Sequence, residues 1–225
     1  MASGDGDHGT ERGARPDRLA IPEPILRGGV IAIARGLPDD RLIRIGDGLA
    51  RGGVGAFEVT LDSPNALAGI AALRARFDPD ELLVGAGTVL DPEAARAAID
   101  AGASFVVTPV LELPVIAAAV ARGVPCIPGA FTPTEILAAW RTGASAVKLF
   151  PASAAGPSFI RELRGPLPGV PIIPTGGVTI EAVPALIAAG AVAIGLGSWL
   201  TGDGDPAGIA ERGARLVEAV RGARG

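Results

Sequence analysis

The chain has 225 residues, of which 48% are hydrophobic and 20% charged, so it can bury a large core and is not mainly disordered. Its net charge of −4, without long runs of like charge, argues against a nucleic-acid partner. The single cysteine, Cys126, excludes a disulfide framework and suits a reducing cytoplasm.

The first segment, residues 1–20, is polar and lacks the apolar region of a signal peptide. We expect a disordered leader there, followed by a single domain over residues 21–225. The uncharged stretch Ala182 to Gly202 approaches transmembrane length, but Pro184 and Gly190 interrupt it. We therefore predict a helix, a turn and a buried strand in that stretch, no membrane partner and a cytoplasmic location.

Short apolar runs recur along the chain, most of them directly after a glycine. They predict strands over residues 29–33, 55–59, 82–85, 102–107, 123–127, 143–147, 169–173 and 190–194. Helical stretches between them end at the same glycines. Ser63, Asp91 and Thr132 each precede a proline and are predicted to cap a helix, and Thr132 with Glu135 has the spacing of a capping box.

Near-continuous apolar strands that alternate with helices are typical of a parallel sheet covered on both faces. Eight such units in about 200 residues predict an α/β protein with a compact (β/α)8 TIM barrel. The alternative is a doubly wound open sheet. That fold usually carries a glycine-rich fingerprint after its first strand, where this chain has Arg35-Gly-Leu-Pro-Asp.

The composition also limits the chemistry. The only histidine, His8, lies in the leader, so a Ser-His-Asp or Cys-His nucleophile has no base. The same shortage excludes histidine-ligated metals and leaves only a carboxylate-held Mg²⁺ or Ca²⁺ as an alternative. We predict no metal and no cofactor.

One basic residue, Lys148, is a lysine, and all others are arginines. Arginine keeps its proton in proteins, whereas a buried lysine amine can become a neutral nucleophile. Strand alternation places Lys148 on the face of Ala144 and Ala146, which we expect to point into the barrel. The alternative is a stray surface lysine.

Glu58 is a carboxylate within an apolar strand, on the face of Ala56 and Thr60, and is also expected to point inward. An amine nucleophile beside its proton shuttle is the functional interpretation of Lys148 and Glu58. The alternative is a buried salt bridge that only stabilises the core.

Glycine-containing turns follow the last two predicted strands, with Gly176 and Gly177 after one and Gly197 and Ser198 after the other. Such turns let backbone N–H groups approach an anion, and this end of a barrel is the usual place for a substrate phosphate. Two tight turns that need glycine for steric reasons alone are the alternative.

Five ordered motifs resemble the 2-keto-3-deoxy-6-phosphogluconate (KDPG) aldolases. They are Glu58-Val-Thr-Leu, Val84-Gly-Ala-Gly-Thr-Val, Val147-Lys-Leu-Phe-Pro-Ala, Pro174-Thr-Gly-Gly-Val and Gly197-Ser-Trp-Leu. The resemblance implies a class I, metal-independent aldolase, commonly a homotrimer. It assigns the Schiff base to Lys148, the proton shuttle to Glu58, keto-acid binding to Thr88, and phosphate binding to Gly176, Gly177 and Ser198.

Asp62 departs from the pattern, because some family members have an arginine at this place. The segment around Asp62 resembles relatives that act on the galactonate epimer, whereas Thr175 resembles the gluconate enzymes. We take Arg35 as the substitute partner of the substrate carboxylate and Thr175 as a further substrate-binding residue.

The predicted activity is reversible cleavage of KDPG to pyruvate and glyceraldehyde 3-phosphate, with 4-hydroxy-2-oxoglutarate as a further substrate. The alternatives are an aldolase for the galactonate epimer, a phosphosugar isomerase or synthase on the same barrel, and a non-catalytic phosphate-binding protein.

Overall fold

The computed structural model describes residues 18–202 and 204–225, with the backbone alone for Asp39 and Asp40. Most of the predicted leader therefore lies outside the described residues. The first half contains α1 Glu23–Gly28, β1 Val30–Ala34, α2 Asp39–Arg51, β2 Ala56–Thr60, α3 Ala66–Arg76, β3 Leu83–Gly87, α4 Pro92–Asp100, β4 Val106–Val107 and α5 Leu113–Ala121. The second half contains β5 Cys126–Ile127, β6 Gly129–Ala130, α6 Pro133–Thr142, β7 Val147–Leu149, α7 Ala152–Arg164, β8 Ile172–Pro174, a 3-10 turn Ile180–Ala182, α8 Val183–Ala188, β9 Ile194–Leu196, α9 Ser198–Thr201 and α10 Pro206–Arg224.

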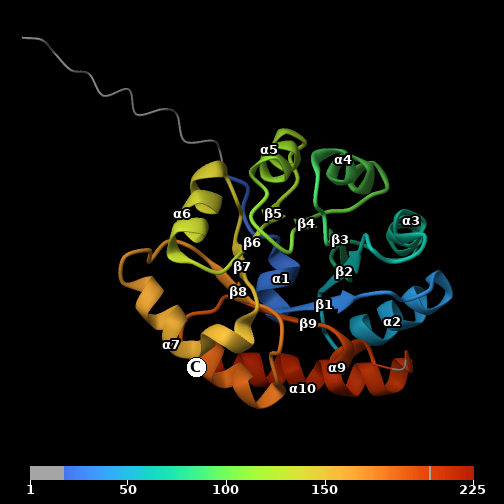
Figure 1. Cartoon of the computed structure of the whole chain (residues 1–225). Helices are drawn as coiled ribbons and strands as arrows, with labels where there is room; N and C mark the ends of the chain where they lie inside the picture. The colour runs from blue at the N-terminus through green and yellow to red at the C-terminus, as the bar shows by residue number, and fades with distance from the viewer. Residues whose placement is uncertain (1–17, 203) are drawn as a thin grey trace, which may run out of the picture.

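The strands form a closed parallel barrel. Within the described residues, one sheet has the order β5-β4-β3-β2-β1-β9 and a second the order β6-β7-β8. The two meet at both edges. β5 and β6 are one strand interrupted at Pro128, which has no N–H to donate, and a parallel bridge between Thr175 and Gly195 joins β8 to β9. The described chain thus forms the predicted (β/α)8 barrel, and the open sheet was the wrong alternative (Figure 1).

Two separate cores stabilise the barrel. Phe57, Val59 and Val147 belong to the larger one, between the strands and the surrounding helices. The smaller one fills the barrel axis and includes Ala56 and Ala146. This confirms the predicted alternation, by which Glu58 and Lys148 share the inward face.

Ala144 was wrongly predicted to share that inward face. It lies in the outer core, because β7 begins only at Val147 and the alternation does not extend back to Ala144. The sequence reasoning also missed α1. Its Ile25 is fully buried in the axial core, where it closes the amino-terminal end of the barrel. Figure 1 shows α1 at the centre of the ring of strands.

The helix caps were predicted correctly at two of three places. The Asp91 side chain accepts a hydrogen bond from the Ala94 N–H, and Thr132 forms the capping box with Glu135. The cap at Ser63 was wrong. α3 begins at Ala66, and the Ser63 hydroxyl instead accepts a hydrogen bond of 2.8 Å from the Gly36 N–H after β1.

The stretch from Ala182 to Gly202 contains the predicted helix, turn and strand as α8, a turn and β9. It also contains the short helix α9, which was not predicted. Among the residues that the structure describes, no helix is both long enough and apolar enough to cross a membrane. The last helix, α10, packs along α2 and α8 on the outside of the barrel (Figure 1).

Candidate active site

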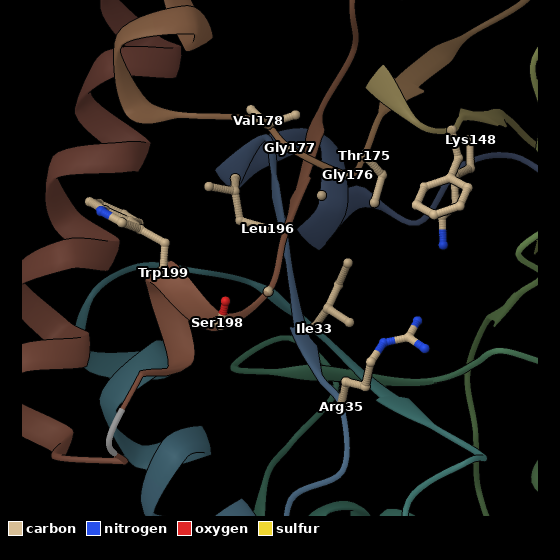
Figure 2. A pocket seen from close by; sticks show the side chains of 13 residues that line it. Ile33, Arg35, Lys148, Thr175, Gly176, Gly177, Val178, Leu196, Ser198 and Trp199 are labelled. Carbon is tan, nitrogen blue, oxygen red and sulfur yellow. The ribbon is translucent and has the colours of Figure 1, made fainter. Parts of the chain in front are cut away.

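A cavity of about 470 Å³ opens at the carboxyl ends of β1, β7, β8 and β9. Seven of the nine predicted site residues line it: Arg35, Lys148, Thr175, Gly176, Gly177, Gly197 and Ser198. Figure 2 shows the side chains of Arg35 and Lys148 turned toward each other, with Ser198 and Trp199 toward the other end of the cavity. Residues from distant parts of the sequence thus meet where barrel enzymes bind their substrates.

Lys148 lies in the middle of β7, and only 4% of its surface is exposed. Its backbone N–H donates to the Pro128 carbonyl, 2.9 Å away, which holds the residue against the interrupted strand. The amine lies 5.1 Å from the ring centre of Phe150, within the range of a cation–π contact. The lysine is therefore a buried group on an ordered strand that faces the cavity, and not a stray surface lysine.

Glu58 lies deeper, in β2, with 2% of its surface exposed. Burial raises the pKa of its carboxyl group above the ordinary value; the positive charges of Lys148 and Arg35 act in the opposite direction, and the negative charge of Asp62 raises it further. Its Oε1 atom has no hydrogen-bond partner in the described part of the chain. A buried polar atom without a partner is costly, and such sites are often functional.

The salt-bridge alternative for Glu58 and Lys148 does not fit this geometry. The described residues contain no direct ion pair between these two side chains, although their charges influence each other. Glu58 does not line the cavity itself. Its carboxyl group lies against Gly87 of β3.

Arg35 follows β1 at the cavity rim. Its Nη1 donates to Asp62 Oδ2 at 2.9 Å, and its Nη2 donates to Thr88 Oγ1 at 3.3 Å. Thr88 does not line the cavity itself; its hydroxyl binds the side chain of Arg35, which does. With φ of 56°, Thr88 adopts a left-handed conformation that is unusual for a β-branched residue and is found mainly at functional sites.

The predicted phosphate-binding residues line the cavity on the turns that follow β8 and β9. Gly176 and Gly177 have φ of 87° and 71°, a region that glycine adopts without strain. A β-carbon on Gly177 would collide with Ser153 at the start of α7. Gly197 immediately precedes α9, and Ser198 begins it. The turn at Gly176 and Gly177 therefore needs glycine for steric reasons, whereas a β-carbon at Gly197 would meet only the Ile33 carbonyl oxygen, 3.9 Å away. Both turns line the cavity.

Sequence reasoning missed two aromatic residues that line the cavity, Phe150 and Trp199. Both are more than a third exposed. Each follows a predicted site residue closely, Phe150 two positions after Lys148 and Trp199 next to Ser198. An aromatic residue within two positions of a candidate functional residue was the sequence signal that could have found them.

Other chemistries have little support in the described residues. They contain no group of three or more histidine, cysteine, aspartate or glutamate side chains that could hold a metal ion. Cys126 is buried in β5, and burial raises the pKa of its thiol to about 12, so it is not a reactive thiolate.

The barrel and the buried lysine at its carboxyl-terminal end define the chain as a (β/α)8-barrel enzyme with an amine in its cavity. Comparison with known proteins identifies the family of this enzyme. A family model described as KDPG and KHG aldolase matches residues 23–208. The chain belongs to this aldolase family and is a lyase.

Relatives with different substrates are similarly close to this chain. The 2-dehydro-3-deoxy-6-phosphogalactonate aldolase of Escherichia coli (strain K12) is 39% identical over 195 residues, covering 85% of this chain and 94% of the relative. The 2-dehydro-3-deoxy-phosphogluconate aldolase of Pseudomonas aeruginosa is 36% identical over 204 residues, covering 90% and 88%. A solved structure described as native KDPGal matches with a TM-score of 0.82 and 38% identity, covering 86% and 95%.

Proposed function

We propose that the chain is a class I aldolase that cleaves KDPG to pyruvate and glyceraldehyde 3-phosphate through an imine on Lys148. The observation that carries the proposal is the position of Lys148: the single lysine of the chain is buried on β7 and faces the cavity. An arginine could supply charge there, but a guanidinium does not form an imine under these conditions. An isomerase or synthase on the same barrel would not require this amine.

The first half of the proposed reaction builds an electron sink. The neutral Lys148 amine attacks the C2 ketone and forms a carbinolamine, and loss of water gives a protonated imine. The electron pair of the C3–C4 bond moves into this imine and leaves an enamine. Glu58, directly or through a water molecule, accepts the C4 hydroxyl proton as that bond breaks.

The second half regenerates the lysine. Glyceraldehyde 3-phosphate leaves, and the proton held by Glu58 returns to C3 of the enamine. Water then hydrolyses the imine and releases pyruvate. The raised pKa of Glu58 supports this role, because a carboxyl group that titrates nearer neutrality both accepts and returns a proton effectively.

Charged parts of the substrate are assigned to the two ends of the cavity. Arg35, with Thr88 behind it, binds the keto-acid carboxylate beside Lys148. Gly176, Gly177, Gly197 and Ser198 bind the phosphate at the far end, where backbone N–H groups and a hydroxyl can donate. This arrangement also accommodates 4-hydroxy-2-oxoglutarate, which has a second carboxylate at its far end.

The epimer preference rests on Thr175. Its side chain is 6% exposed, lines the cavity and packs against Gly195, which supports a contact with a substrate hydroxyl and a preference for the gluconate epimer. The galactonate epimer is the second candidate. It is favoured by Asp62, because the segment around Asp62 resembles relatives that act on the galactonate epimer.

A homotrimer in the cytoplasm completes the proposal. Exposed apolar side chains gather on the loops or helix starts after β2, β3, β4 and β6: Leu67, Leu90, Val110, Leu113 and Phe131. Such a row on one side of the barrel mouth fits contact with a second copy of the chain. Sedimentation equilibrium measures the mass directly, and a monomer at assay concentrations would contradict the trimer.

Borohydride trapping tests the central step. Incubation with pyruvate and borohydride is expected to add a single adduct on Lys148, located by peptide mass spectrometry. Lys148→Arg should fold as the wild type does but lose the adduct and the aldolase activity. An adduct confined to the N-terminal amine, or wild-type turnover in Lys148→Arg, would contradict the imine mechanism.

A further inference from the structure

Arg35 is restrained more tightly than its exposure suggests. More than half of its side chain is exposed, yet Nη1 is bound to Asp62 and Nη2 to Thr88. An exposed arginine normally samples many rotamers. Two hydrogen bonds from the two terminal nitrogens instead fix both the position and the plane of the guanidinium.

The backbone on either side of Arg35 is held by the same turn. The Ala34 carbonyl accepts a 3.0 Å hydrogen bond from the Thr60 hydroxyl, and the Gly36 N–H donates to Ser63 at 2.8 Å. Thr60 and Ser63 are themselves 3.2 Å apart, oxygen to oxygen. Asp62 lies between them in the chain, so one short turn after β2 holds both the main chain and the side chain of Arg35.

The restrained guanidinium still has free donor capacity. A guanidinium has five N–H donors, and the bonds to Asp62 and Thr88 use two of them. Figure 2 shows the guanidinium directed into the cavity, toward the amine of Lys148. A carboxylate next to the imine carbon can therefore bind Arg35 without displacing Asp62.

We propose that Asp62 is a positioning residue that acts through Arg35: its carboxylate holds the guanidinium in the orientation that binds the carboxylate of pyruvate and of the keto-acid substrate. This inference rests on the proposed function, in which Arg35 binds that carboxylate. Asp62 does not touch the substrate itself. Its effect should therefore appear in the binding of the keto-acid end and be absent at the phosphate end.

A simple charge effect makes the opposite prediction. If Asp62 only placed a negative charge near the cavity mouth, it would repel pyruvate, and its removal would tighten binding. If Asp62 positions Arg35, removal of the Asp62 carboxylate weakens pyruvate binding, because the unrestrained Arg35 side chain must then be ordered each time pyruvate binds. The direction of the change therefore distinguishes the two effects.

The test is a double-mutant cycle with Asp62→Asn, Arg35→Gln and the double variant. The pyruvate concentration that gives half-maximal borohydride trapping on Lys148 is measured for each protein. We expect Arg35→Gln to raise this pyruvate concentration about tenfold or more, because a hydrogen bond to a charged group is lost. We expect Asp62→Asn to raise it by about three- to tenfold. In the Arg35→Gln background, Asp62→Asn should have no further effect.

Two controls separate positioning from a general loss of structure. Asp47→Asn removes a similar exposed pair, Arg76–Asp47 at 2.8 Å, on the outside of the barrel and should leave trapping unchanged. In the condensation direction, the KM for glyceraldehyde 3-phosphate should be the same in Asp62→Asn and the wild type. A substitution that only destabilised the protein would not raise the pyruvate concentration for half-maximal trapping while leaving the KM for glyceraldehyde 3-phosphate unchanged.

The outcomes of the cycle are distinct. Unchanged or tighter pyruvate binding in Asp62→Asn would overturn the positioning role, as would an equal loss in the Arg35→Gln background. Either result leaves the imine mechanism intact. If wild-type Lys148 forms no adduct, the proposed function itself fails, and the inference fails with it.

Discussion

The carboxyl group of Glu58 lies against the Cα atom of Gly87 on the neighbouring strand β3, so closely that a β-carbon at Gly87 would overlap it. Gly87→Ala must therefore displace the Glu58 carboxyl group from its position in the structure. We expect turnover to fall by about 10² to 10⁴, the range associated with a positioned acid-base group, while the Lys148 adduct still forms. Steady-state rates and borohydride trapping measure the two effects.

Gly169→Ala is the matched control for this substitution, because a β-carbon at Gly169 meets no atom within 4 Å. It should leave turnover unchanged. Wild-type turnover in Gly87→Ala would show that the position of Glu58 does not matter for the reaction.

Glu58→Gln tests the same carboxyl group through its pH dependence. Burial is the main cause that raises the pKa of Glu58 above the ordinary value of 4.5, so the native state holds this proton more tightly than the unfolded chain. The carboxyl group therefore destabilises the native state progressively as pH rises from about 4.5 to the raised pKa. Glu58→Gln should gain stability relative to the wild type across this window, with no gain below it.

Thermal unfolding at pH 4 and pH 7 measures this difference, and the rate measures the role in catalysis. Turnover of Glu58→Gln should fall by about 10² to 10⁴ with imine trapping retained. Unchanged turnover with altered stability would assign Glu58 to the core alone.

Thr88→Gly should separate stability from activity. Glycine relieves the left-handed conformation at φ of 56°, which costs about 1–3 kcal/mol in a non-glycine residue, but it also increases the entropy of the unfolded chain by about 0.5–1 kcal/mol. We expect an equal or higher melting temperature and a kcat/KM lower by about tenfold, because Arg35 loses its hydrogen bond to Thr88. Thr88→Ser keeps the hydroxyl and should restore most of the activity.

Asn65→Gly is the control for backbone relief, because Asn65 has a φ of 53° and lies outside the cavity. It should leave kcat/KM unchanged. A Thr88→Gly variant with full activity would remove Thr88 from the substrate-binding residues.

Gly177→Ala tests the phosphate end of the cavity. A β-carbon there collides with Ser153, and the φ of 71° is unfavourable for alanine, so the turn must shift. We expect the KM for KDPG to rise by about 10- to 100-fold, the value of one or two hydrogen bonds to a charged group. Pyruvate trapping at Lys148 should be unaffected, and an equal loss for pyruvate would indicate general damage to the barrel.

Thr175→Val tests the epimer preference. The substitution removes the hydroxyl at nearly constant shape, and Thr175 lines the cavity beside Gly176. We expect the wild type to prefer the gluconate over the galactonate substrate by at most about 10², and the ratio of kcat/KM values to approach one in the variant. An unchanged ratio would show that Thr175 does not distinguish the epimers.

The sequence by itself determined the barrel, the inward positions of Glu58 and Lys148, and most of the candidate site. Strand alternation is a local property with a period of two, so the inward positions of Glu58 and Lys148 could be derived from their neighbours. The uniqueness of Lys148 is a matter of composition and needs no coordinates. Glycines at strand ends marked the two phosphate turns, and at Gly176 and Gly177 a positive φ explains why the residue type is restricted.

Tertiary structure alone decided which partner each polar group takes. Ser63 precedes a proline and has the local pattern of a helix cap, but its hydroxyl binds Gly36, a residue brought to it by the pairing of β1 with β2. In the sequence, Asp62 was only a departure from the family motif, and the structure shows that its carboxylate accepts a hydrogen bond from Arg35. Side-chain hydrogen bonds of this kind join residues far apart in the chain, and no local pattern encodes them.

The burial of α1 has the same explanation. Its six residues are too few to carry a clear helical period, so the sequence gives no sign that Ile25 would fill the open end of the barrel. That position is favourable only in the closed barrel, where Ile25 packs against the axial core. The sequence thus determined that Glu58 and Lys148 face the interior, whereas closure of the barrel decided what fills its end and which groups meet at its mouth, because both depend on contacts that exist only in the folded chain.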